Sequence, residues 1–282
     1  MMRAATLATL VVLATALLAA CGSDKAPAAG NTGTPTASST DDPAASASGV
    51  YIALGNSLSA GVGASSPETT FAGIVHNSLG AGFELMNLGH SGDTSDDLIQ
   101  HGHLEKAAAA IESRNGDDDA ANDVRLVTLE IGCNDLLGIY FSLVQTGTCP
   151  DEQTALAKPV CTEALHDALD GFRPNFDSAL ERLREADADV RITVMTLYNP
   201  FDFLGAFGDL GALSLEGRAG TEFPEGMNDI IRAVAAGYED VTIADVYTAF
   251  KSRTAELLSS DFIHPNDAGY RTMADAVIAA LP

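Results

Sequence analysis

Five short aliphatic stretches alternate with longer helical patterns along this chain, and this alternation restricts the possible folds more than any other feature. The stretches are nearly continuous in Val, Ile and Leu, as expected of strands that are covered on both faces. They lie at residues 50–54, 83–88, 126–131, 190–197 and 241–244. Helical patterns lie at residues 71–79, 95–113, 163–185, 225–236 and 267–281. The sequence therefore predicts a three-layer α/β/α sandwich around a mainly parallel, five-stranded sheet.

The beginning of the chain has the composition of an export signal. Arg3 is followed by an unbroken run of small and apolar residues up to Ala20, which favours a secretory signal over a membrane-spanning helix. The run ends in Leu-Ala-Ala-Cys, which resembles a bacterial lipobox. We therefore expect residues 1–20 to be a lipoprotein signal peptide and Cys21 to be lipidated. An ordinary signal peptide, cleaved after an Ala-x-Ala-like site, is the alternative.

Residues 21–49 are rich in Ala, Ser, Thr, Gly and Pro and have almost no large apolar side chain, which predicts a disordered tether. Residues 50–282 are enough for one domain with a sizeable core. We expect an exported protein, anchored by lipid to the extracytoplasmic face of the cell membrane. The net charge is −24 and the chain shows no stripe of Lys and Arg, which argues against nucleic acid as a partner.

Three further cysteines follow the signal, and export permits a disulfide between two of them. Cys149 and Cys161 are the favoured pair, because they would close a short loop that contains Pro150 and Pro159. Cys133 would then remain at the end of a buried strand. The absence of any disulfide is the alternative. Neither the cysteine spacing nor the neighbouring histidines predict a zinc site.

Polar motifs follow three of the predicted strands. They are Gly55-Asn56-Ser57, the segment 89–93, and Gly132-Cys133-Asn134-Asp135. In parallel sheets, ligands bind beyond the carboxyl ends of the strands. The three motifs therefore predict a functional site at one edge of the sheet.

A fourth motif, Asp261-Phe262-Ile263-His264, supplies what a serine nucleophile would need. A serine hydroxyl is a weak nucleophile unless a base lies within hydrogen-bond reach. Ser57 is the candidate nucleophile, His264 its general base, and Asp261 the carboxylate that would orient the base. Acyl transfer also needs donors aimed at the developing oxyanion. The candidates are the backbone N–H groups of Ser57 and Gly92 and the side-chain amide of Asn134.

The four motifs, in this order, resemble those of the SGNH superfamily, also called the GDSL esterases and lipases. The resemblance implies that Ser57 is the nucleophile and first oxyanion donor, and that Gly92 and Asn134 are the other donors. It likewise implies that His264 is the base, that Asp261 is its partner, and that no metal or organic cofactor takes part. The usual first motif of the family is Gly-Asp-Ser, whereas this chain has Asn56 before the serine. That aspartate is not a member of the family's triad.

The expected function is that of a serine esterase or lipase acting at the cell envelope on a lipid or small-molecule ester, through an acyl-Ser57 intermediate. The alternatives are a carbohydrate O-acetylesterase and a catalytically inactive binding lipoprotein. The segment 198–220, rich in Phe, Leu and Gly, is either a core-covering loop or the wall or lid of an acyl pocket. The sequence gives no indication of oligomeric state.

Other polar residues receive plainer interpretations. Ser91 competes with Ser57 as nucleophile, but Asp93 stands where the elbow motif of α/β-hydrolases has its last glycine. His101 and His103 are interpreted as surface residues of a helix. Residues 117–119, three consecutive aspartates, are interpreted as a solvated turn without a pattern of calcium ligands.

Overall fold

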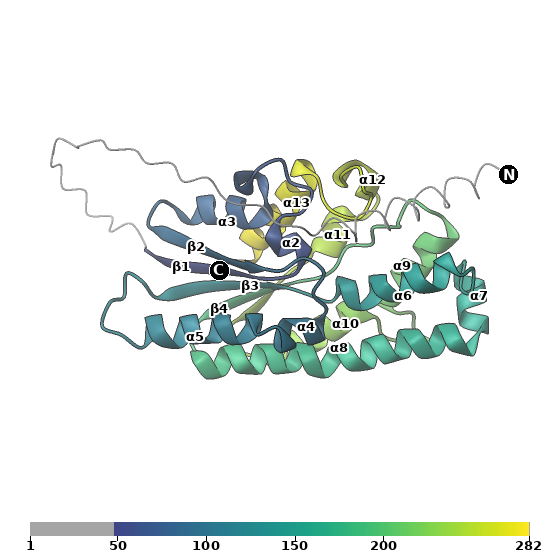
Figure 1. Ribbon diagram of the computed structural model, residues 1–282, viewed down its shortest axis with the longest axis horizontal. Coiled ribbons are helices and arrows are strands. Elements are labelled where there is room, and N and C mark those ends of the chain that lie inside the picture. The colour runs from purple at the N-terminus through teal and green to yellow at the C-terminus, as the bar shows by residue number, and fades with distance from the viewer. Residues whose placement is uncertain (1–47, 282) are drawn as a thin grey trace. The chain divides into compact units, whose positions relative to one another are not determined.

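The computed structural model describes residues 48–281 (Figure 1). The expected signal peptide, Cys21 and nearly all of the expected tether lie outside the described residues. The first strand begins at Gly49, so the domain starts one residue earlier than the sequence predicted. Within residues 48–281, no helix combines the length and the apolar composition needed to cross a membrane.

Five parallel strands form a single sheet. They are β1 (Gly49–Gly55), β2 (Phe83–Gly89), β3 (Val124–Glu130), β4 (Arg191–Met195) and β5 (Val241–Ala244). Their order is β2-β1-β3-β4-β5, and each neighbouring pair is parallel. The chain runs from β1 outward to β2 and then crosses back to β3. The carboxyl ends of β1 and β3 therefore form the switch point at which parallel sheets bind ligands.

Helices cover both faces of the sheet, which confirms the predicted three-layer sandwich (Figure 1). One face carries α3 (Phe71–Leu79), α11 (Val246–Phe250) and α13 (Asp267–Ala280), and the other carries α5 (His103–Asn115), α8 (Pro159–Ala186) and α10 (Met227–Ala235). Successive residues of a strand point to opposite faces. Tyr51 and Ala53 accordingly lie in the core under α3 and α13, whereas Ile52 and Leu54 lie in the core under α5 and α8.

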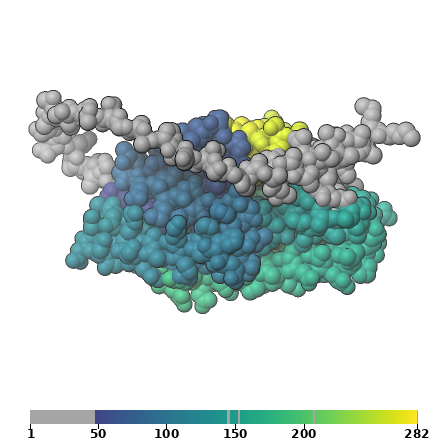
Figure 2. Space-filling view, in the orientation of Figure 1, coloured from purple at the N-terminus to yellow at the C-terminus, as the bar shows by residue number. Residues whose placement is uncertain are grey.

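Several helices differ from the sequence prediction. Gly102, with φ +74°, divides the single helix expected at 95–113 into α4 (Ser95–Gln100) and α5. Both helices pack against α8. The space-filling view shows the segment of α4 and α5, in blue, beside that of α8, in teal (Figure 2). Helix α6 (Cys133–Gln145) occupies a stretch for which no helix was predicted, so Asn134 stands in the first turn of a helix rather than in a loop.

The remaining short elements lie mostly at the carboxyl edge of the sheet or in the region beyond it. They are α2 (Ser57–Ala60), the 3-10 helix η1 (Pro67–Thr69), α7 (Glu152–Ala157), α9 (Ala206–Glu216) and α12 (Thr254–Leu257). Helix α9 lies inside the segment 198–220, where Phe201, Leu210 and Leu213 are buried in the core. For these three side chains the core-covering interpretation is correct.

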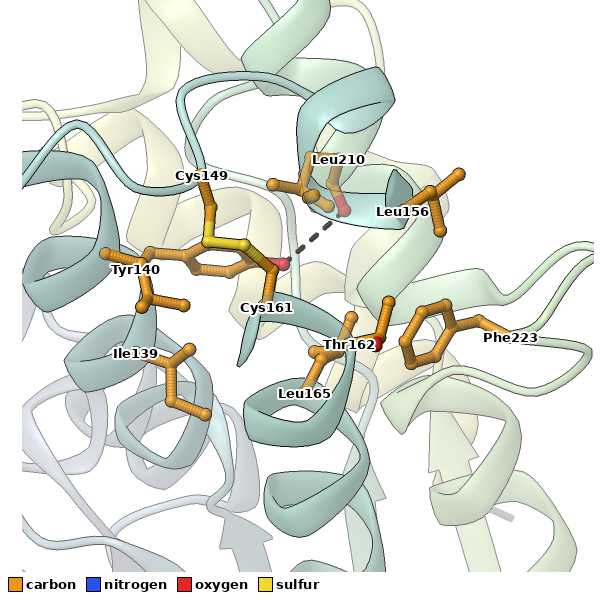
Figure 3. Close-up of a pocket in the computed structure, with 11 residues that line it drawn as sticks. Ile139, Tyr140, Cys149, Leu156, Cys161, Thr162, Leu165, Leu210 and Phe223 are labelled. Atoms are coloured by element: carbon orange, nitrogen blue, oxygen red, sulfur yellow. Dashed lines mark hydrogen bonds between the residues drawn. A yellow bond between two sulfur atoms is a disulfide. The ribbon is translucent and has the colours of Figure 1, made fainter. Parts of the chain in front are cut away.

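A disulfide joins Cys149 to Cys161, the pair that the sequence favoured, and links the loop after α6 to the first turn of α8 (Figure 3). Beside it is a small apolar pocket with side chains from four helices, among them Tyr140, Leu165 and Leu210. Cys133 is the free cysteine of the described residues. The pocket contains no member of the predicted triad.

Candidate active site

Strand β1 delivers Ser57 to the carboxyl edge of the sheet. Gly55 lies so close to β3 that a Cβ atom there would stand 2.0 Å from the carbonyl oxygen of Glu130. The buried side chain of Asn56 then caps α2, because its Oδ1 accepts a hydrogen bond from the backbone N–H of Leu58 at 3.1 Å. Ser57 is the first residue of this helix, where a backbone N–H has no partner inside the helix.

The structure brings Ser57, His264 and Asp261 together, although 207 positions separate the serine from the histidine. Nε2 of His264 lies 3.1 Å from Oγ of Ser57. Nδ1 of the same ring lies 2.7 Å from Oδ2 of Asp261. The three side chains thus form a continuous line of hydrogen bonds in which a base faces a hydroxyl and a carboxylate faces the base.

The carboxylate of Asp261 is held by its own loop. Its Oδ1 accepts hydrogen bonds from the backbone N–H groups of Ile263 and His264, both at 2.9 Å. The hydroxyl of Ser259 donates to the same oxygen at 2.9 Å. Partial burial by itself would raise the pKa of Asp261, but the bonds from the His264 ring and from the two backbone groups outweigh burial and hold this pKa well below its usual range. The carboxylate therefore stays ionised beside the imidazole.

A tyrosine that follows β4 fixes the position of this loop. The hydroxyl of Tyr198 donates to the carbonyl oxygen of Ile263 at 2.6 Å. Its ring stacks on Phe250, with 4.4 Å between the ring centroids. The loop needs such support because Phe262 adopts φ +60°, a left-handed conformation that is unfavourable for a bulky residue. This role of Tyr198 cannot be predicted from the sequence, since nothing local links a tyrosine after β4 to a loop 65 residues later.

The segment after Ser57 docks directly on the beginning of α13. The hydroxyl of Tyr270 donates to the carbonyl oxygen of Val62 at 2.7 Å. The carboxylate of Asp267 accepts from the backbone N–H of Ser65 at 2.8 Å and from its hydroxyl at 2.6 Å. A Cβ atom on Gly63 would stand 2.5 Å from the carbonyl oxygen of Pro265, so a glycine is required for this approach. These contacts fix the position of Ser57 relative to His264.

The other two predicted oxyanion donors, Gly92 and Asn134, lie on segments that adjoin the one carrying Ser57. The N–H of His90 donates to the carbonyl oxygen of Gly55 at 2.9 Å, which ties the loop after β2 to the end of β1. Gly92 in this loop has φ +94°. The side-chain amide of Asn134 donates to the carbonyl oxygen of Asp93 at 2.8 Å and has a second N–H to offer. The rival nucleophile Ser91 is exposed and has no hydrogen bond to a histidine among the described residues.

The aspartate of the third motif joins this region to α4. Oδ1 of Asp135 accepts from the hydroxyl of Ser95 at 2.5 Å, and Oδ2 accepts from its backbone N–H at 2.9 Å. Burial raises the pKa of Asp135, although both bonds from Ser95 oppose the shift. Asp135 therefore connects the start of α6 to the loop that carries Gly92.

A second buried acid lies beneath the nucleophile. Glu130, at the end of β3, is fully buried, and burial raises its pKa to about 8. Its Oε1 lies 3.8 Å from Sγ of Cys133, which in turn accepts a hydrogen bond from Nδ2 of Asn56 at 3.0 Å. Burial also raises the pKa of the Cys133 thiol. An aspartate at position 56 would bring a second carboxylate into this cluster and could not make the donation to sulfur.

Two aromatic rings are exposed beside the triad. Phe262, between Asp261 and His264, is 38% exposed, and Phe203 is 40% exposed. Their ring centroids lie 6.4 Å apart. Large exposed hydrophobic side chains are rare in the described part of the chain, where Val160 is the other example. The pair therefore offers exposed apolar contact area next to the loop of Asp261 and His264.

His101 is exposed, as the sequence predicted, whereas His103 is only 20% exposed. Both rings, together with His90, face the buried carboxylate of Asp93. Burial lowers the pKa of His103. The sequence does not reveal this cluster, because the loop after β2 and the helix pattern that follows look like separate elements.

Comparisons with known proteins place the chain in a family. The GDSL-like lipase/acylhydrolase family model matches residues 53–272. The spore germination lipase LipC of Bacillus licheniformis is 28% identical over 240 residues, which cover 82% of this chain and 95% of that protein.

Solved structures share the fold. The lipase Lip_vut3 from a goat rumen metagenome has a TM-score of 0.57 at 21% identity, covering 82% of this chain and 96% of its own. Phospholipase A1 from Streptomyces albidoflavus NA297 has a TM-score of 0.54 at 20% identity, covering 83% of this chain and all of its own. Since the family model spans most of the chain, the protein belongs to the GDSL-like lipase/acylhydrolase family and is a carboxylic ester hydrolase.

Proposed function

We propose that the protein hydrolyses carboxylic esters through an acyl-Ser57 intermediate. The observation that carries this proposal is the line of hydrogen bonds from Ser57 through His264 to Asp261. As Oγ of Ser57 attacks the ester carbonyl carbon, Nε2 of His264 takes the hydroxyl proton, and the ionised Asp261 stabilises the resulting imidazolium. His264 then gives the proton to the departing alkoxide. Water, activated by the same base, attacks the acyl-enzyme and releases the acid.

The negative oxygen of each tetrahedral intermediate needs preorganised donors. The backbone N–H of Ser57 stands unpaired at the start of α2, and Gly92 and Asn134 approach from the two adjoining segments. No described residue accepts a hydrogen bond from the N–H of Gly92. We assign these three donors to the oxyanion. The bond from Asn134 to the carbonyl of Asp93 keeps the second and third donors close to each other.

Replacing Ser57 or His264 by Ala tests the proposal. Each change should lower kcat for p-nitrophenyl esters by about a thousandfold or more, because it removes the nucleophile or its base. Circular dichroism should show an intact fold. Ser91→Ala is the matched control and should retain activity.

A fluorophosphonate should label the parent protein and fail to label Ser57→Ala. Ester turnover close to that of the parent in both variants would refute the mechanism, and a parent protein that neither turns over nor is labelled would favour the inactive binding lipoprotein.

The substrate we propose is an ester with a long acyl chain, as in a lipid. Support comes from the exposed rings of Phe203 and Phe262 beside His264, since exposed aromatic area favours contact with an acyl chain. The similarity to a protein named as a spore germination lipase agrees with this choice. A carbohydrate O-acetyl ester is the alternative substrate.

Substitutions at the two rings separate these substrates. Phe203→Ala should lower kcat/KM for octanoyl and longer esters about tenfold, because burying a large apolar side chain is worth roughly 1.5–3 kcal/mol. Phe262→Asn should act in the same way, since asparagine tolerates the left-handed backbone. Acetyl ester turnover should change little. Val160→Ala, which changes an even more exposed hydrophobic residue on α8, is the control. Preference of the parent protein for acetylated sugars, with no effect of either ring on long-chain esters, would contradict the lipid proposal.

We also propose that the protein is exported and anchored to the extracytoplasmic face of the cell membrane through lipid on Cys21. The support is the sequence alone, namely the apolar run that ends at this cysteine and the polar tether that follows it. An anchor of this kind would hold a lipase close to lipid esters.

A further inference from the structure

Three histidine rings surround the carboxylate of Asp93. Nδ1 of His90 and Nδ1 of His101 lie 2.6 Å and 3.1 Å from Oδ1 of Asp93. Nε2 of His103 lies 3.6 Å from Oδ2 of the same carboxylate. One nitrogen or oxygen atom from each of the four side chains lies within 4.8 Å of the other three. This arrangement is separate from the triad and is not used in the ester hydrolysis described above.

The burial of Asp93 requires an explanation. Its side chain is 2% exposed, and within residues 48–281 its Oδ2 accepts no hydrogen bond. The ion pairs found for it there are all with histidines, which carry a charge only when protonated. Leaving a buried carboxylate oxygen without a hydrogen-bond partner costs free energy. A cation placed among the four side chains would remove this cost.

We propose that His90, Asp93, His101 and His103 bind a zinc ion. Zinc prefers four ligands in a tetrahedron and accepts imidazole nitrogen and carboxylate oxygen. With bonds of about 2.0–2.2 Å, the four donor atoms would stand roughly 3.3 Å apart. The separations between Asp93 and the histidines, 2.6, 3.1 and 3.6 Å, lie on both sides of that value. All four donor atoms lie within 4.8 Å of one another. Side-chain shifts on the order of 1 Å would therefore bring them to the spacing of a tetrahedral site.

The surroundings also suit a metal site. Oδ1 of Asp97 lies 3.7 Å from Nε2 of His101, on the ring nitrogen that does not face Asp93. Carboxylates in this position commonly orient metal-binding histidines. The rings of His90 and His103 stack with 4.9 Å between their centroids, which fixes their relative placement. His90 and His101 are about half exposed, so an ion can enter from solvent.

The fold explains why these residues converge. Gly102, in the left-handed region with φ +74°, separates α4 from α5 and lets the flanking His101 and His103 both face Asp93. Four protein ligands leave no open position on zinc, so the site is structural rather than catalytic. A bound ion would join the end of α4 and the start of α5 to the loop that carries Gly92. We therefore expect zinc to stabilise the loop that carries Gly92.

Metal titration of tag-free protein tests the site. After treatment with a chelator and dialysis, the protein should bind one equivalent of Zn²⁺ by calorimetry, with a rise in Tm. Co²⁺ should bind in the same place and give the intense visible absorption of a tetrahedral complex. His101→Gln and His103→Gln should each weaken zinc binding at least about tenfold, because each removes a ligand. Two single variants are used so that misfolding of one, detected by circular dichroism, does not decide the outcome.

The controls distinguish this site from other binding. His166→Gln, which changes an exposed histidine on α8, should bind zinc as the parent does. Ser57→Ala should also bind one equivalent, because the zinc site does not depend on the proposed ester chemistry. Absence of saturable Zn²⁺ binding by the parent protein would overturn the proposal. Undiminished binding by folded His101→Gln and His103→Gln would overturn it as well.

Discussion

The residue beside the nucleophile shows how one side chain can suit its neighbours while departing from a family motif. Asn56 donates to Sγ of Cys133 and caps α2 through its other amide atom. Glu130 lies against the same cluster, fully buried and with its pKa raised to about 8. An aspartate at position 56 would place an ionisable carboxyl group in this buried cluster, and burial disfavours its charged form. The neutral amide avoids that cost and keeps the cap.

Glu130 makes the stability of the domain depend on pH. In the unfolded chain its pKa is near 4.5, whereas in the folded protein burial raises it to about 8. Between these values the folded state alone holds the proton, so unfolding releases it and the free energy of unfolding falls as pH rises, by on the order of 1 kcal/mol per pH unit.

Glu130→Gln should remove this part of the pH dependence, because glutamine has no proton to lose. Urea denaturation at pH 5, 6.5 and 8 should show the variant gaining stability relative to the parent protein as pH increases. The exposed Glu239→Gln serves as the control and should follow the parent. A constant difference between Glu130→Gln and the parent at all three pH values would contradict the buried, protonated acid.

At the scale of elements, the position of the loop from Asp261 to His264 depends on a residue that follows β4, which is far from this loop in the sequence. The loop from Asp261 to His264 is shaped internally by the hydrogen bonds that Asp261 accepts. Its place in the molecule is set from outside by Tyr198, which follows β4 and donates to the carbonyl of Ile263. Both kinds of contact are required, because a loop that is rigid internally must also be placed so that His264 lies within hydrogen-bond distance of Ser57.

Tyr198→Phe tests this external support. The ring should still stack on Phe250, but the carbonyl of Ile263 loses its donor, so stability should fall by about 1 kcal/mol. We expect kcat to fall several-fold while KM stays nearly constant, since the change displaces the base rather than the substrate. Tyr238→Phe, which removes a hydroxyl bonded to Asp177, is the matched control. If both variants lost stability equally and neither changed kcat, Tyr198 would have no positioning role.

At the scale of the whole molecule, the parallel sheet brings distant motifs to a common edge. Ser57 follows β1, Gly92 lies in the loop after β2, and Asn134 begins the helix after β3. The strand order places β1 between β2 and β3, so all three arrive side by side. Helix α13, which follows His264, is joined to the segment after Ser57, because Tyr270 donates to Val62 and Asp267 accepts from Ser65.

The proposed anchor is also a property of the whole molecule. Cys21→Ala should release the protein from the membrane fraction into the soluble fraction, because the acyl chains supply the binding free energy. Fractionation of cells that express the parent or the variant measures this directly, and Cys133→Ala provides a cysteine control inside the domain. Specific activity on a soluble ester should be unchanged by Cys21→Ala. Equal membrane partitioning of parent and variant would argue against lipidation.

The sequence by itself determined the five strands, most of the long helices and the choice of Ser57, His264 and Asp261. These features follow from local patterns, namely apolar periodicity, turn residues and short ordered motifs, so they can be recognised in the sequence alone. Helices α6 and α9 escaped prediction, as did the break at Gly102, because their patterns were interpreted as a loop or as part of a neighbouring helix.

Only the tertiary structure decided which side chains become neighbours across the sheet. The burial of Glu130 under Asn56, the support of Ile263 by Tyr198 and the convergence of three histidines on Asp93 each join separate elements. Such contacts depend on how strands and helices are stacked, and a linear pattern does not record that stacking. Periodicity predicts which face of an element is buried, whereas the packing of the elements determines which side chains that face contacts.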